Sequence, residues 1–309
     1  MSELHTAVRE YLAVRRRLGY TLKDAGWLLP DFADYMHDKG CACVTTQLAL
    51  AWATQPTGVS PIWWRQRLGM VKGFARYLKT IDPSTEIPPR DLLPAVYSRI
   101  TPYLYSDADV AALMAATRSL SPTLRAATYQ TLIGLLAVSG LRIGEAIRLA
   151  RTDIDDAGSV LLVRRSKGDS AREVPLHATA LRALHTYARK RDRHFPVARS
   201  PSLFVSVRGT RLSQSAVNAT FRELVGHTGL EERGPRCRPR IHDLRHSLAV
   251  TTLLDWYRQG VDVDAKLPLL SSVLGHVDPA STYWYLQAAP QLLALACQRL
   301  EAVPDQDMS

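Results

Sequence analysis

A proline-rich stretch over residues 80–104 most constrains what this chain can fold into. It contains five prolines and shows no helical or strand period (Pro83, Pro88, Pro89, Pro94 and Pro102). Proline lacks a backbone N–H and disfavours helical geometry in the residue before it, so such a stretch does not continue a helix. We therefore expect a linker over residues 81–104 that joins two domains. With 309 residues, the chain is long enough for each domain to have its own core.

The part before the linker, residues 1–80, is predicted to be an all-α helical bundle. Apolar residues recur at helical spacing in four segments, over residues 3–20, 21–39, 46–52 and 61–79. Thr21 is the expected N-cap of the second helix, and Thr45 or Thr46 that of the third. Four helices of this size are sufficient for a small bundle.

The strong positive charge of the chain indicates a polyanionic partner. The formal net charge is +10 and the sequence pI is about 9.6, which alone leaves nucleic acid, a membrane surface and the ribosome open. The predicted helix over residues 61–79 carries a stripe of four cations and no acid (Arg65, Lys72, Arg76 and Lys79). This stripe favours a helix that lays one edge along a DNA backbone over an ordinary amphipathic helix. Arg15-Arg16-Arg17 fits a solvated helix end and a phosphate contact equally well.

Several classes of protein fit the sequence poorly. No apolar run approaches the length of a membrane span, and the first residues form no secretory signal, so we expect a cytoplasmic protein without a membrane partner. Four cysteines are present, of which Cys41 and Cys43 are separated by one residue. Because no second Cys or His pair follows nearby, we interpret them as reduced thiols and expect neither a metal nor a cofactor.

The part after the linker is predicted to be mainly α with a small antiparallel β-sheet, an α+β domain over residues 105–290. Ser106 and Ser213 are the expected N-caps of helices that run to about residues 117 and 227. Further helices are expected over residues 123–138, 179–194, 268–274 and 290–302. Strands are expected over residues 160–165, 172–176 and 203–205, and the first two should form a hairpin with Lys167 in its turn.

The segment Ile241–Ser247 carries a pair of side chains suited to phosphate. His242 and Arg245 are three residues apart, which places both on one face of a helix. Leu244 lies on a neighbouring face and can bury that side in the core. A guanidinium fork binds two phosphate oxygens, while an imidazole donates a hydrogen bond or a proton. Alone the pair is a weak signal, because most such pairs are surface pairs or caps.

Three further motifs strengthen the interpretation of the pair as a phosphate-binding site. Together with the pair they form a set in a fixed order along the chain. In chain order the motifs are Leu-Arg142-x-Gly-Glu145, Lys167-Gly followed by Arg172-Glu-Val-Pro-Leu, His242-x-Leu-Arg245-His, and Leu-Gly-His276 with Tyr285 nine residues later. This set resembles the tyrosine recombinase family, also called the phage integrase family, over about residues 100–290. The segment Ser281–Leu286 is similar to recombinases of transposons and related mobile elements. Residues 1–80 fit the family's core-DNA-binding domain by position, length and character.

The resemblance implies a site-specific DNA recombinase that cleaves and rejoins DNA through a 3′-phosphotyrosine intermediate, without metal, cofactor or ATP. The residues that it assigns to catalysis are Arg142, Lys167, His242, Arg245, His276 and Tyr285. In these roles Tyr285 is the nucleophile, and Arg142 and Arg245 hold the non-bridging phosphate oxygens. Lys167 is the general acid toward the 5′-oxygen, His242 handles the nucleophile's proton, and His276 donates a hydrogen bond to the scissile phosphate.

The resemblance also implies partners. It predicts binding to double-stranded DNA recombination sites and a homo- or hetero-tetramer that assembles on DNA through the C-terminal helix and tail, residues 291–309. It therefore also predicts association with the nucleoid when the protein is bound to DNA.

Alternatives remain at the level of residues and of function. Tyr283 is the nearest competing nucleophile, but it follows His276 by seven residues instead of nine. Glu145 is interpreted as a supporting residue and His246 as a structural one. An accessory DNA-binding protein of the same fold, acting with partner recombinases, would lack catalysis. A type IB topoisomerase or a hairpin telomere resolvase would use the same chemistry, although the two-domain length favours recombination.

Overall fold

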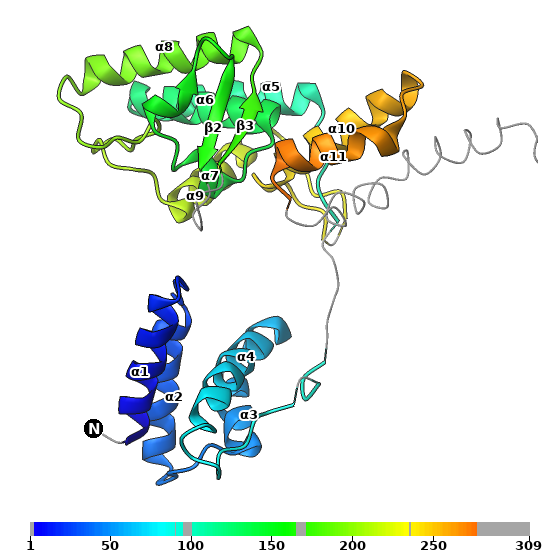
Figure 1. Cartoon of the computed structure of the whole chain (residues 1–309). Helices are drawn as coiled ribbons and strands as arrows, with labels where there is room; N and C mark the ends of the chain where they lie inside the picture. Colours follow the sequence, from blue (N-terminus) through cyan, green and yellow to red (C-terminus); the bar gives the residue numbers. More distant parts are fainter. Residues whose placement is uncertain (1–2, 90, 95–100, 165–170, 235, 277–309) are drawn as a thin grey trace, which may run out of the picture. The chain divides into compact units, whose positions relative to one another are not determined.

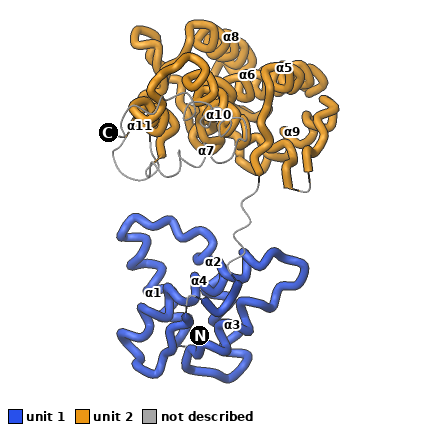
Figure 2. The backbone as a smooth tube through the Cα atoms, turned by 90° about the vertical axis from the view of Figure 1, so that its right-hand side faces the viewer, with its two compact units in different colours: residues 1–99 blue, residues 100–309 orange. Residues whose placement is uncertain are grey.

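The computed structural model describes residues 3–89, 91–94, 101–164, 171–234 and 236–276 (Figure 1). The chain divides into two compact units, residues 1–99 and 100–309 (Figure 2), and each is described by itself. Within the described residues, no helix combines the length and the apolar character that a membrane crossing requires.

In the described part of the first unit, four α-helices form a bundle. They are α1 (Glu3–Arg17), α2 (Ala25–Asp38), α3 (Thr46–Thr54) and α4 (Pro61–Leu78). Their apolar stripes meet in one core, in which Phe32, Trp52 and Phe74 are fully buried. The Thr45 side chain accepts a hydrogen bond from the Leu48 N–H at 3.3 Å, so Thr45 caps α3 as expected.

The connection between α1 and α2 differs from the prediction. Helix α1 ends at Arg17, because Gly19 takes a positive φ of 85° and the chain turns there. Helix α2 begins only at Ala25, so the prediction of Thr21 as its N-cap is wrong. Leu22 has a φ of 42°, which lies outside the helical region and breaks the helix that the sequence suggested.

The stretch after α4 packs partly against each unit. The Glu86 N–H donates to the Val44 carbonyl at 2.8 Å, and the Glu86 carboxylate accepts from the Thr46 N–H at 2.7 Å. Further along, Tyr103 and Tyr105 are buried in the core of the second unit. The two ends of the proline-rich stretch are therefore ordered by the units that they join.

The second unit is mainly α-helical, with a small antiparallel sheet, as predicted. In its described residues the helices are α5 (Asp107–Ala116), α6 (Thr123–Ser139), α7 (Ile143–Ala146), α8 (Ala178–His194), α9 (Gln214–Gly226), α10 (Asp243–Arg258) and α11 (Val263–Leu274). Short 3-10 turns occupy Thr117–Ser119 and Arg151–Asp153. Helix α6 is central, because it packs against α5, α8 and α10 and buries Leu132, Ile133 and Leu136.

The sheet has the strand order β1-β2-β3, with β1 (Ile154–Asp155), β2 (Val160–Arg164) and β3 (Ala171–Pro175). The predicted antiparallel pairing is confirmed, since β2 and β3 pair with Leu161 opposite Val174 and Val163 opposite Arg172. The predicted turn with Lys167 lies outside the described residues. Strand β1 was not predicted, because two residues are too few to show a period. The predicted strand over 203–205 is wrong: the chain there makes single bridges, Val205 to Arg211 among them.

Helix α11 begins earlier than its proline suggests. It starts at Val263, where the Asp262 side chain accepts a hydrogen bond from the Ala265 N–H at 3.1 Å. Pro268, the predicted first residue, lies inside the helix. The end at Gly275 is as predicted, because this residue adopts a left-handed conformation with φ 68°.

Candidate active site

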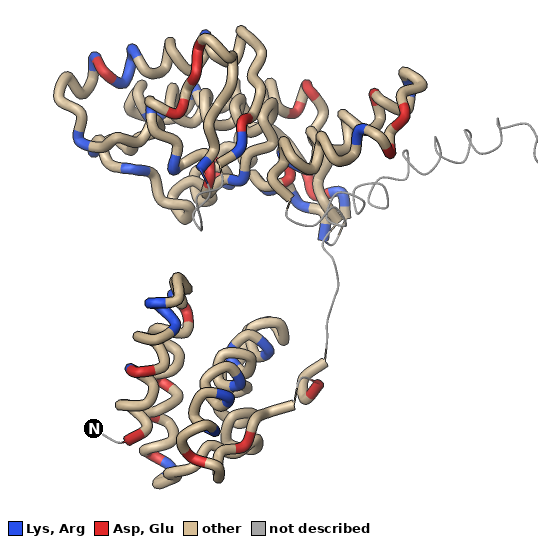
Figure 3. The backbone as a smooth tube through the Cα atoms, in the orientation of Figure 1, with Lys and Arg blue, Asp and Glu red and all other residues tan. Residues whose placement is uncertain are grey.

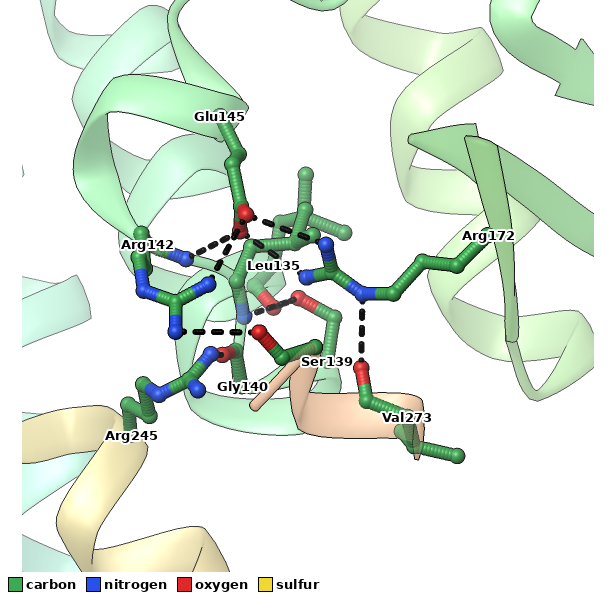
Figure 4. Close-up of polar contacts among 10 residues, drawn as sticks. Leu135, Ser139, Gly140, Arg142, Glu145, Arg172, Arg245 and Val273 are labelled. Atoms are coloured by element: carbon green, nitrogen blue, oxygen red, sulfur yellow. Dashed lines mark hydrogen bonds and ion pairs between the residues drawn. The ribbon is translucent and has the colours of Figure 1, made fainter. Parts of the chain in front are cut away.

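The end of α6 brings together three helices of the second unit. Gly140 terminates α6 with a φ of 61°. A Cβ at this position would lie 2.7 Å from Leu274 Cδ2 of α11 and 3.0 Å from Leu248 Cδ2 of α10. Only glycine therefore allows the close approach of these helices. The Gly140 carbonyl accepts a hydrogen bond from Arg245 Nη1 at 2.6 Å, which fixes the buried Arg245 side chain at the junction (Figure 4).

Arg142 stands two residues further on, immediately before α7. Its backbone N–H donates to Glu145 Oε2 at 2.8 Å, and its Nη1 donates to Glu145 Oε1 at 3.1 Å. Its Nη2 donates to the Gly275 carbonyl at 3.1 Å, at the end of α11. The side chain is nevertheless 41% exposed, so Arg142 combines a fixed position with access to a ligand.

Glu145 joins Arg142 to a second arginine, Arg172 of β3 (Figure 4). Arg172 donates to both carboxylate oxygens, at 3.0 and 2.9 Å, and its Nε donates to the Val273 carbonyl at 2.9 Å. Burial acts to raise the pKa of Glu145, but the hydrogen bonds from Arg172 and Arg142, with their positive charges, outweigh it and lower the pKa to about 2. Glu145 is therefore ionised and links Arg172 of β3 to Arg142, and both arginines also donate to carbonyls at the end of α11.

His276 lies directly after the left-handed Gly275. Its backbone N–H donates to the Ser271 carbonyl at 2.9 Å, which continues the turn at the end of α11. Burial, and then the positive charges of Arg245, Arg142 and Arg172, lower the pKa of the imidazole to about 4. The ring is therefore neutral at pH 7 and lies within the field of the arginine cluster.

His242 is the residue before α10 and lies at the surface. Its ring centroid is 5.0 Å from that of His246, in an edge-to-face arrangement. Partial removal of water around the ring, and then the positive charge of Arg245, lower the pKa of His242. Burial and the neighbouring His242 and Arg245 lower the pKa of His246 to about 3.

The first turn of α10 is anchored by Asp243, which the sequence reasoning did not single out. Arg240 donates to both of its carboxylate oxygens, at 2.9 and 3.0 Å, and the Tyr103 N–H donates to Oδ2 at 3.3 Å. One turn later, the Ser247 hydroxyl accepts from the Tyr105 N–H at 2.7 Å. The chain at the start of the second unit thus holds the helix that carries His242 and Arg245.

Four of the six predicted site residues are described, and they belong to one cluster. Arg142, His242, Arg245 and His276 come from three segments and act electrostatically on one another. Lys167 and Tyr285 lie outside the described residues. The cluster presents guanidinium groups and neutral imidazoles, the groups that bind an anionic phosphate and move protons beside it.

The sequence profile of the phage integrase family matches residues 104–291. The chain belongs to the phage integrase family. An integrase/recombinase named y4rB, from Sinorhizobium fredii, is 42% identical over 307 residues, covering 97% of this chain and 98% of the relative. A tyrosine recombinase XerC from Alcanivorax borkumensis is 30% identical over 230 residues, covering 74% of this chain and 70% of that protein.

Solved structures agree with the fold. The Tn1549 transposon integrase, in complex with transposon right end DNA, superposes with a TM-score of 0.66 at 16% identity, covering 96% of this chain and 99% of that chain. The predicted membership of the tyrosine recombinase family is thus confirmed, and with it the class of enzyme: a site-specific recombinase or integrase.

Proposed function

We propose that this chain cleaves and rejoins double-stranded DNA at recombination sites through a 3′-phosphotyrosine on Tyr285, and that it moves or resolves a mobile element. One observation carries the proposal: in a member of the phage integrase family, Arg142, Arg245 and His276 meet around the end of α6 with His242 beside them. A phosphodiester is the anion that such a cluster suits.

Arg245 and Arg142 differ in burial, and both are oriented by hydrogen bonds in a way that suits phosphate binding. Arg245 is 2% exposed and is fixed by the Gly140 carbonyl, so its position is set before DNA binds. Arg142 is partly exposed, and its guanidinium is oriented by the ion pair with Glu145. Guanidinium groups that are already oriented stabilise the negative charge that gathers on the non-bridging oxygens in the transition state.

The proposed reaction balances without a cofactor. The Tyr285 oxygen attacks phosphorus while its proton passes to His242, whose lowered pKa leaves it neutral and able to accept at pH 7. The bond to the 5′-oxygen breaks, and Lys167 supplies the proton for that oxygen. His276 donates a hydrogen bond to the phosphate. The reverse steps rejoin the strand, so the phosphodiester energy is conserved in the protein–DNA bond.

The two domains would have different roles, one in DNA binding and one in catalysis. We assign DNA binding to residues 1–80, in which α4 carries basic positions along its length (Figure 3), and catalysis to residues 105–290, with residues 81–104 as the linker. Residues 291–309 would join protomers in a homo- or hetero-tetramer on DNA, in the nucleoid. A lambda integrase tetramer bound to a Holliday junction is a structural neighbour and supports this assembly.

The experiment that tests the proposal is a cleavage assay on nicked duplex DNA from the end of the element, which traps the covalent intermediate. The unchanged protein should form a covalent adduct that is lost in Tyr285→Phe. An adduct that persists in Tyr285→Phe and disappears in Tyr283→Phe would move the nucleophile to Tyr283. Confirmed DNA binding without any adduct would favour an accessory protein that acts with partner recombinases.

A further inference from the structure

Glu145 is shared unequally between two arginines. Arg172 makes a two-point contact, from Nη1 to Oε1 at 3.0 Å and from Nη2 to Oε2 at 2.9 Å. Arg142 reaches the carboxylate with Nη1, at 3.1 Å, and with its backbone N–H. Parallel guanidinium–carboxylate contacts are the stronger geometry, so Arg172 is the principal partner of Glu145.

Arg172 is also the enclosed member of the pair. Its side chain is 9% exposed, whereas that of Arg142 is 41% exposed. The backbone of Gly275 passes so close that a Cβ there would lie 2.6 Å from Arg172 Nη1, and the Val273 carbonyl accepts from Nε. Arg172 therefore faces Glu145 and the end of α11, and it has little room to bind DNA directly.

We propose that Arg172 is a positioning residue that occupies Glu145 with a two-point contact and so keeps the guanidinium of Arg142 available for the scissile phosphate. The inference rests on the proposed function. Both a carboxylate and a phosphate attract a guanidinium at this distance, so an unoccupied Glu145 would compete with DNA for Arg142. The cluster of Arg172, Arg142, Arg245 and Glu145 contains three positive charges and one negative charge, a net charge of +2. Without Arg172 its net charge is +1.

The substitution Arg172→Met tests this, because it removes the charge and keeps most of the side-chain length. We expect Glu145 to close on Arg142, and the single-turnover rate of covalent adduct formation to fall about 100-fold at unchanged duplex affinity. Adding Glu145→Gln removes the competing charge and should restore the rate by about 10-fold or more. Arg172→Lys keeps the charge without the fork and should lose less than about 10-fold.

A second arginine–carboxylate pair in the same sheet serves as a control, and its arginine is more exposed than Arg172. Arg164 of β2 donates from Nε to Oδ1 of the buried Asp153 at 3.1 Å, and neither residue contacts Arg142 in the described structure. Arg164→Met, with and without Asp153→Asn, should leave the cleavage rate unchanged. All rates are compared at a temperature at which circular dichroism shows every variant to be folded, so that differences in stability do not enter.

Recovery in the double variant supports the inference. A double variant as slow as Arg172→Met would overturn it, because Arg172 would then act only by holding the Val273 turn. If Arg172→Met does not fold, the comparison of Arg172→Gln, which also removes the charge, with and without Glu145→Gln decides in the same way. An unchanged protein that forms no adduct would refute the proposed function instead, so the two failures are distinguishable.

Discussion

A single methyl group at Gly140 should destabilise the second unit strongly. In Gly140→Ala, the new Cβ would lie 2.7 Å from Leu274 Cδ2 and 3.0 Å from Leu248 Cδ2, at a φ of 61°. The left-handed backbone costs about 1–2 kcal/mol and the overpacking about 1–3 kcal/mol more, so the expected loss in free energy of unfolding is about 2–5 kcal/mol.

Gly260→Ala separates the two contributions. Gly260 has a similar φ of 72°, but nothing lies within 4 Å of the position its Cβ would take. This variant should lose only the backbone contribution, about 1–2 kcal/mol. Differential scanning calorimetry of the full chain measures both, since each kcal/mol lowers the midpoint by about 2–4 °C in a unit of this size.

Equal shifts in the two variants would refute the reasoning. They would mean that α6, α10 and α11 separate at negligible cost, so that the contacts at Gly140 do not determine stability. The transition of the first unit serves as an internal control, because neither glycine belongs to it. Its midpoint should stay in place in both variants.

Three other predictions concern stability. The pKa values of His276, about 4, and of His246, about 3, lie below those of the unfolded chain, which therefore binds protons first as the pH falls. Stability is then complete above about pH 6.5 and should fall between pH 7 and pH 5, by less than about 2 kcal/mol per histidine because water screens these partly exposed rings, measured by urea unfolding. Ser106→Ala removes the side chain that accepts from the Asp109 N–H and should cost about 1 kcal/mol in the same assay. Asp243→Asn leaves the half-buried Arg240 without its carboxylate and should cost about 3 kcal/mol.

Each of these has a result that contradicts it. Equal free energies of unfolding at pH 7 and pH 5 would show that the histidines are accessible to protons in the folded state, and His246→Gln should weaken the pH dependence without removing it, because the pKa values of His242 and His276 are lowered as well. An unchanged free energy of unfolding in Ser106→Ala would mean that α5 is stabilised by packing alone. An Asp243→Asn variant as stable as the unchanged protein would mean that the Arg240 contact contributes nothing.

Local chemistry made much of the fold predictable. Side chains that cap helices, such as Ser106 and Thr45, mark helix starts, because they satisfy N–H groups that the helix cannot. Gly140 and Gly275 mark helix ends, because each adopts a left-handed conformation. The prediction of Thr21 as an N-cap failed because a hydroxyl caps a helix only when the backbone after it is helical. The backbone of Leu22, which follows Thr21, is not helical.

The site was predictable only as a set of residues, not as a set of contacts. The ordered motifs led to Arg142, His242, Arg245 and His276 without any knowledge of distance. Arg172 was visible beside its motif, but its partner Glu145 lies 27 residues away and on another element, and no local pattern joins them. A signal could have come from charge: a buried strand position occupied by arginine needs a buried acid nearby.

The backbone hydrogen bonds of Tyr103 and Tyr105 to α10 determine where the second unit can be shortened. A fragment that begins at Ser106 would lose the N–H groups that Asp243 and Ser247 accept from, together with the Tyr105 hydroxyl that donates to the Arg240 carbonyl at 3.1 Å. It would also lose two aromatic rings from the core. The smallest piece of the second unit that keeps the first turn of α10 in place must therefore begin at or before Pro102.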